Sequence, residues 1–101
     1  MEGITYKFLA SVYQYPSSPS AQGWFFVSLP KELSVEIRNN FKMLEGGWGR
    51  LKVVAKVGTS EWDTSIWFDT KEDTYLLSLN AKIRKSENIS IDSAINVEIT
   101  I

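Results

Sequence analysis

The chain has 101 residues, of which 44% are hydrophobic, 13% aromatic and 23% charged, and eleven Lys and Arg stand against twelve Asp and Glu. This length predicts a single domain, residues 1–101, with one hydrophobic core. The sequence contains no His and no Cys, which excludes disulfide scaffolds, thiol catalysis, Ser-His-Asp hydrolysis and metal sites built on those residues. The net charge of −1 argues against tight, non-specific binding to nucleic acid.

The start of the chain has none of the basic, apolar and small-residue segments of a secretory signal. No window approaches the ~20 apolar residues of a membrane span. We therefore expect a cytoplasmic protein without a membrane contact.

Alternation of apolar and polar residues predicts β-strands over most of the chain. The first strand covers residues 4–12 and places Tyr6 and Phe8 on its buried face. Proline and serine predict a loop over residues 15–23. Residues 24–29 form a second strand, which is apolar at nearly every position, so we expect both of its faces to be buried, with Trp24 in the core.

Pro30 begins a different pattern, in which apolar residues recur at helical spacing as far as Leu44. Proline suits the start of a helix, and the following Gly46 and Gly47 suit its end. These residues predict one α-helix at about 31–44.

Three strands are predicted next, at residues 51–57, 61–68 and 74–79, joined by a hairpin turn at 58–60 and a polar turn at 69–73.

A short helical turn at about 81–87 and a last strand at 95–101 complete the chain. Six short strands with one helix predict a mainly β domain, a small closed or nearly closed six-stranded β-barrel. Closure is expected because a short open sheet would expose two edges.

An internal repeat relates residues 23–33 to residues 73–83, where aromatic, apolar and Ser-Leu positions coincide at an offset of fifty. Two interpretations stay open. Any two strand-to-helix junctions share such features, or the barrel is pseudo-symmetric and is built from two strand–turn–helix units.

Several motifs together resemble a known family. They are residues 24–30 (WFFVSLP) with the helix that carries Arg38, then 47–49 (GWG), 62–66 (WDTSI), 75–79 (YLLSL) and 83–85 (IRK). The order and spacing resemble the small bacterial family known as domain of unknown function 1905, from Tyr6 to Ile99. The resemblance implies a compact six-stranded β-barrel with a short helix, and it supplies no activity, cofactor or catalytic residue.

The segment from Leu79 to Ile99 is also similar to the swapped-hairpin barrels of transition-state regulators and antitoxins. Asp92 and Ser93 replace the Gly-Asp pair of that pattern, which weakens the analogy with DNA-binding proteins. Similar architecture does not transfer function.

Aromatic residues outside the expected core indicate a ligand surface at the barrel opening. Trp67 falls on the polar face of its strand and Trp48 falls in a loop, and exposed aromatics beside polar groups are typical of binding surfaces. Shielding of the barrel mouth explains them equally well. The candidate ligand-binding residues are Trp48, Arg50, Trp67, Asn80 and Arg84.

The densest basic cluster is Lys82, Arg84 and Lys85, which could contact nucleic-acid phosphates. Acidic residues are interleaved with the basic ones, so a solvated mixed-charge surface is the favoured interpretation. Binding to nucleic acid would require that folding separates the two signs of charge.

Acidic residues around Asp63 and Asp69 are the one candidate set for paired-carboxylate catalysis. They surround a polar turn, where acids are common. The sequence predicts no catalytic residue, no cofactor and no metal site.

The prediction is therefore a non-catalytic module that binds a small molecule or a protein, as a monomer or a homodimer. The alternative is a DNA-binding transcriptional regulator or antitoxin-like protein. An enzyme that uses carboxylates only ranks last.

Overall fold

The computed structural model describes residues 3–15 and 24–101, with the side chain of Trp48 left out. The loop expected from the sequence falls on residues 16–23, outside the described residues, except for Tyr15, which ends a strand. Among the described helices, none is long and apolar enough to cross a membrane.

The described residues form seven strands and two α-helices. In chain order they are β1 (Thr5–Ser11), β2 (Tyr13–Tyr15), β3 (Trp24–Ser28), α1 (Lys31–Phe41), β4 (Arg50–Val57), β5 (Ser60–Asp69), β6 (Thr74–Ser78), α2 (Ala81–Ser86) and β7 (Ala94–Thr100). Two 3₁₀ turns, η1 (Lys42–Leu44) and η2 (Gly47–Gly49), connect α1 to β4.

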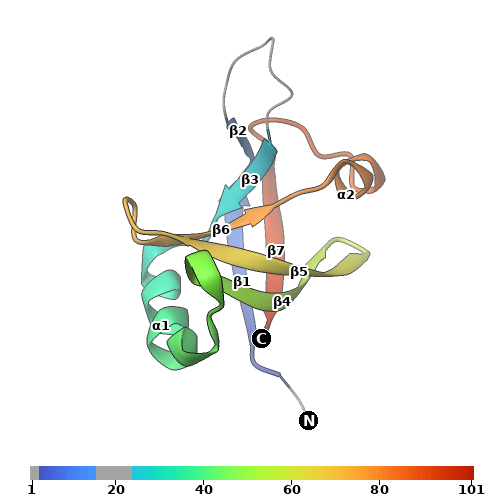
Figure 1. The fold of residues 1–101 in the computed structure, drawn as a ribbon. Helices are drawn as coiled ribbons and strands as arrows, with labels where there is room; N and C mark the ends of the chain where they lie inside the picture. Colours follow the sequence, from blue (N-terminus) through green and yellow to red (C-terminus); the bar gives the residue numbers. More distant parts are fainter. Residues whose placement is uncertain (1–2, 16–23) are drawn as a thin grey trace.

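All seven strands belong to one antiparallel sheet in the order β1-β7-β4-β5-β6-β3-β2. The sheet curves into an open half-barrel, in which β1 and β7 run across β4, β5 and β6 (Figure 1). Figure 1 also shows α1 and α2 on opposite sides of the molecule.

The mainly β character is confirmed, but the closed six-stranded barrel expected from the alternation and from the family resemblance is wrong. The strand predicted at residues 4–12 bends at Val12, where its N–H donates to Ser93 O (2.9 Å) and its carbonyl accepts from the Asp92 N–H (2.8 Å). The chain thereby leaves β7 and continues as β2 beside β3. This bend makes a seventh strand and leaves β1 and β2 as the two edges.

The core lies on the concave face of the sheet, as the alternation predicts. Its members are Tyr6, Phe8, Val12, Val27, Leu29, Ile37, Leu51, Val53, Ala55, Val57, Ile66, Tyr75, Leu77, Leu79, Val97 and Ile99. Trp24 is a correction, because it is 68% exposed rather than buried. It begins β3 and pairs with Tyr15 of the edge strand β2.

The predicted helix at 31–44 divides into α1, which ends at Phe41, and the tighter turn η1. Ser34 and Ile37 form the buried side of α1. α2 matches the turn predicted at 81–87 to within one residue and starts at Asn80, whose side-chain oxygen accepts from the Ile83 N–H (2.9 Å).

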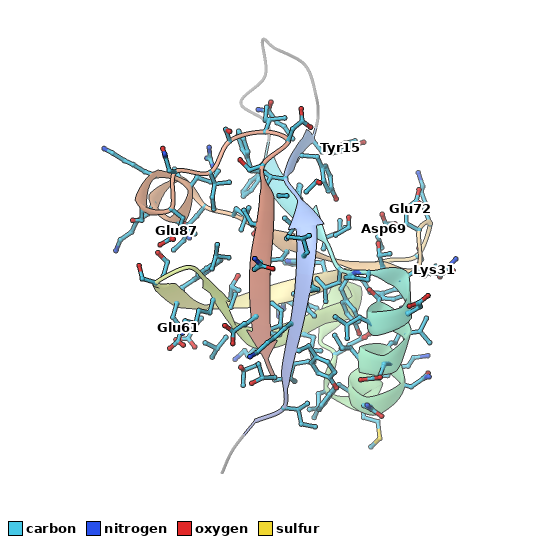
Figure 2. The ribbon with its side chains drawn as sticks, turned by 180° about the vertical axis from the view of Figure 1, so that it is seen from behind. Tyr15, Lys31, Glu61, Asp69, Glu72 and Glu87 are labelled. Atoms are coloured by element: carbon cyan, nitrogen blue, oxygen red, sulfur yellow. The ribbon has the colours of Figure 1, made fainter. Side chains whose placement is uncertain are left out.

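The hairpin between β4 and β5 turns at Gly58 and Thr59, as predicted, with Val57 opposite Ser60. Gly58 has a φ of +59°, a conformation that favours glycine. Ser60 Oγ donates to Glu87 Oε2 (2.6 Å), so the hairpin holds the end of α2. Figure 2 shows Glu87 and Glu61 on this side, and Lys31, Asp69 and Glu72 on the other.

The two copies of the internal repeat pair directly with each other. β3 and β6 are antiparallel neighbours, with Val27 opposite Leu77. The Leu29 N–H donates to Tyr75 O (2.9 Å), and the Leu79 N–H donates to Phe25 O (2.8 Å). An offset of fifty residues converts each of these bonds into the other, so the hydrogen bonding at this junction is two-fold symmetric.

Candidate functional site

The convex face of the β4–β5 pair carries a charged and aromatic surface. Because side chains alternate along a strand, Leu51 is buried while Arg50 and Lys52 are exposed. The ladder sets Trp67 opposite Arg50 and Ser65 opposite Lys52. Two cations of one strand therefore face an indole and a hydroxyl of the next.

A groove of about 740 Å³ lies over this surface. Its lining residues are Arg50, Lys52, Val53, Val54, Asp63, Thr64, Ser65, Trp67, Ser78, Thr100 and Ile101. Two of these carry a positive charge and one, Asp63, a negative charge. The volume falls within the ~300–1,000 Å³ of small-ligand sites.

Arg50 is positioned from two sides. Its carbonyl accepts a hydrogen bond from the Gly46 N–H (2.7 Å), and a Cβ placed on Gly46 would lie 3.6 Å from the Arg50 guanidinium. On the other side the Arg50 guanidinium carbon is 5.8 Å from the centroid of the Trp67 ring. The guanidinium therefore lies beside the groove, close to Gly46 and to the Trp67 ring.

The structure separates the five candidate ligand-binding residues. It brings together Arg50 and Trp67, which is 38% exposed, whereas the side chain of Trp48 lies outside the described part. Asn80 caps α2, and neither it nor Arg84 lines the groove.

Arg84 has a local structural role. Its Nε donates to Leu79 O (3.1 Å), and its guanidinium carbon lies 3.8 Å from the centroid of the Phe25 ring. Lys82 and Lys85 are exposed on α2. The basic turn of the sequence therefore divides into one arginine packed on the domain and two solvated lysines.

A second polar cluster lies between α1 and β6. The hydroxyl of the fully buried Tyr75 donates to Glu45 Oε2. Burial raises the pKa of Tyr75; the hydrogen bond to Glu45 and the Glu45 charge raise it further, while the Arg38 charge lowers it. Phe68 meets the Tyr75 ring edge-on at 5.0 Å, and the Arg38 guanidinium lies over Phe68 at 3.7 Å.

Sequence reasoning missed this cluster because alternation treats Tyr75 as one more core aromatic. The available signal was chemical: a buried tyrosine needs a partner for its hydroxyl, and Glu45 follows the only long helix. The cluster fixes one end of the domain, since the ring of Tyr75 is packed and its polar tip is satisfied.

The carboxylates considered for catalysis do not converge. Asp63 and Asp69 lie on one strand six positions apart, a separation of about 20 Å, whereas paired-carboxylate sites need about 5–9.5 Å. Asp69 Oδ1 accepts from the Lys71 N–H (2.9 Å) and shapes the turn. Among residues 3–15 and 24–101, no group of three or more acidic residues is placed to hold a metal ion.

The described residues form a curved antiparallel sheet with a groove on its convex face. A helix follows each of two symmetric strand junctions. These features define a class of small half-barrel domains. Within that class the chain belongs to the family described as "Domain of unknown function (DUF1905)", whose model matches residues 8–99. The resemblance seen in the motifs is thereby confirmed. No curated protein matches the sequence.

Proposed function

We propose that this domain is a non-catalytic binding module that takes a small anionic ligand in the groove beside Arg50, Lys52 and Trp67. The observation that carries the proposal is the position of Arg50, held between Gly46 and Trp67 at the wall of the groove. A positioned guanidinium loses little freedom when it binds, so more of the interaction energy appears as affinity.

The charges around the groove favour an anion. Arg50 and Lys52 are two positions apart on one face of β4, a separation of about 7 Å. The hydroxyls of Ser65 and Ser78 line the same groove and can donate further hydrogen bonds. A carboxylate or phosphate between the two cations would gain charge-assisted bonds from both.

The indole of Trp67 supplies the apolar contact. Ligand sites combine aromatic or aliphatic walls with a few polar groups that fix orientation. An exposed Trp ring opposite Arg50 offers a flat surface for the uncharged body of the ligand. The ligand class is therefore a small organic anion.

The residues lining the groove support binding without catalysis. Its hydroxyl groups have neither His nor Cys beside them, since the sequence has none, and Asp63 is the one acidic side chain in the lining. A hydroxyl nucleophile needs an adjacent general base. The nucleic-acid alternative has no corresponding support within the described ranges, because Lys82 and Lys85 lie on α2 and not along the groove.

The experiment is a two-dimensional NMR titration of the ¹⁵N-labelled protein with benzoate and with phenyl phosphate. We expect saturable shifts of the backbone amides of Lys52, Ser65 and Trp67. Arg50→Gln should weaken binding about tenfold or more, because a hydrogen bond to a charged group contributes about 1.5–3 kcal/mol.

Lys56→Gln is the matched control. Lys56 lies on the same strand and the same exposed face, and its removal changes the net charge equally, but it does not line the groove. We expect binding to Lys56→Gln within about twofold of the unmodified protein, since screened charges at a distance contribute little. Unsaturable shifts, or equal weakening by both substitutions, would reject the site.

A further inference from the structure

A second hollow adjoins the groove at its two cations. It has a volume of about 340 Å³ and shares Arg50, Lys52 and Ile101 with the groove. The residues that it adds are Leu44, Gly46 and Leu51. We call this hollow the apolar trough, because its only charged side chains are those of the two shared cations.

The wall of the trough contains an apolar side chain that is exposed to solvent. Leu44 in η1 is 67% exposed. Single exposed apolar side chains are common. Here Leu44 lines a hollow that shares Arg50 and Lys52 with the cationic groove, so the two hollows form a continuous surface with a polar centre and an apolar arm.

The two arms beyond the cations differ in polarity. The arm toward Trp67 contains Asp63 and the hydroxyls of Ser65 and Ser78. The arm toward Leu44 contains only aliphatic side chains and glycine. An aliphatic chain is favoured in the second arm, where no polar side chain besides the two cations has to give up its hydration.

We infer that the ligand is an amphipathic carboxylate with an unbranched aliphatic chain. Its acid group lies between Arg50 and Lys52, and its chain follows Leu44 and Ile101. This inference rests on the proposed function, because it uses the same two cations and adds the ligand's class. The chain contributes affinity in proportion to the apolar area that the trough covers.

The test is a series of carboxylates of increasing length: acetate, hexanoate, octanoate and decanoate, each below its micelle concentration. Binding is followed by the amide shifts of Leu44, Lys52 and Ile101. We expect the dissociation constant to fall about two- to fourfold per methylene until the trough is filled. A dissociation constant that is independent of chain length would overturn the inference.

Two neighbouring substitutions supply the matched comparison. Leu44→Ser removes a trough side chain, whereas Met43→Ser removes the adjacent apolar side chain, which is 98% exposed and does not line the trough. Both sites are exposed, so both variants should fold. Leu44→Ser should weaken decanoate several-fold and leave acetate unchanged, while Met43→Ser should change neither. Equal effects of the two substitutions would overturn the inference that the trough binds the aliphatic chain.

The outcomes separate this inference from the proposed function. Arg50-dependent binding of benzoate without any chain-length effect would reject the trough and retain the anion groove. Chain-length dependence that survives in Arg50→Gln would indicate adsorption to an apolar surface and would reject the inference. The last experiment measures binding of the protein to phosphatidylglycerol vesicles. Binding to vesicles without saturable binding of monomeric decanoate would reject the inference and assign Leu44 to a membrane contact instead.

Discussion

The junction from β3 into α1 and the junction from β6 into α2 share a backbone and differ in the side chains that fix each helix. Their strands pair about Val27 and Leu77, and each helix reaches across to the strand of the other copy. Ser34 Oγ of α1 accepts from the Tyr75 N–H of β6 (3.0 Å). Arg84 of α2, fifty positions later, lies over Phe25 of β3.

The difference shows that one backbone frame accepts two kinds of helix contact. Ser34 is fully buried, and α1 also inserts Ile37 into the main core. Arg84 is half-buried, and α2 lies at the surface with its end tied to the β4–β5 hairpin through Glu87. α1 is therefore part of the main core, whereas α2 lies outside it and is attached through Ile83 and polar contacts.

Truncating the buried isoleucine of each helix should produce the largest difference in stability between the two junctions. Ile37→Ala should destabilise the domain by about 3–4 kcal/mol and Ile83→Ala by about 2 kcal/mol, within the range for buried Ile. Ile83 is 7% exposed and lies outside the main core cluster, so its loss leaves less unfilled space. Urea unfolding measures both values.

Val35→Ala, at an exposed site of α1, should change stability by less than about 0.5 kcal/mol. Equal losses for the two isoleucines would remove the distinction.

Ser34→Ala tests the buried contact of α1. It leaves the Tyr75 N–H without its side-chain acceptor in a dry environment, so we expect a loss of about 1–3 kcal/mol. Chemical denaturation of the variant beside Ser86→Ala, an exposed serine of α2, isolates the effect. If Ser34→Ala were as stable as Ser86→Ala, the cross-strand contact would not stabilise the junction.

Arg84→Met tests the corresponding contact of α2. Methionine keeps an apolar side chain against Phe25 and loses both the guanidinium and the hydrogen bond to Leu79 O. A loss of about 1 kcal/mol is expected, because cation–π contacts contribute about 0.5–2 kcal/mol. Thermal melting against Lys85→Met, an exposed neighbour, provides the measurement. A loss larger than that of Ser34→Ala would reverse the ranking of the two junctions.

At pH 10.5 the smallest effect belongs to Tyr75. Its pKa is raised in the folded protein above the ordinary value of 10.0, so the folded state keeps the proton that the unfolded state releases. The resulting stability is complete below pH 10 and is lost as the pH rises above it. Half a pH unit above that value the loss is about 0.8 kcal/mol.

Unfolding free energies between pH 9 and 11 measure this loss. Tyr75→Phe should show a shallower decline with pH than the unmodified protein. Tyr15→Phe, at a site 69% exposed, should follow the unmodified protein. Parallel curves for all three proteins would show that the buried hydroxyl has no part in the alkaline transition.

Most of the fold was predictable because local rules decide it. Alternation located the strands, helical spacing located α1, and Gly58 located the hairpin. The bend at Val12 was not predictable, because hydrogen bonds to Asp92 and Ser93, eighty residues away, produce it. The pairing of Trp24 with Tyr15 has the same origin, since it depends on the chain continuing as β2 after the bend.

The candidate site was predictable in part. Strand alternation placed Trp67 on an outward face, whereas Arg50 lay just before the strand predicted at 51–57; the ladder sets the two opposite each other. Asn80 and Arg84 were grouped with them because all lie near strand ends, yet distance in space depends on the curvature of the sheet, which no local pattern specifies. The apolar trough combines η1 with the last strand, a pairing that only the tertiary structure reveals.

The pairing of β1 with β7 also bears on how the chain is made. Thr5 lies opposite Thr100, and β7 fills the place between β1 and β4. A ribosome adds roughly 5–20 residues per second, so β1 waits about 5–20 s after its own synthesis for its ladder partner. During that interval the aromatic rings of Tyr6 and Phe8 have no finished sheet to enter. The first strand of a nascent chain therefore remains without its ladder partner until β7 has been synthesised.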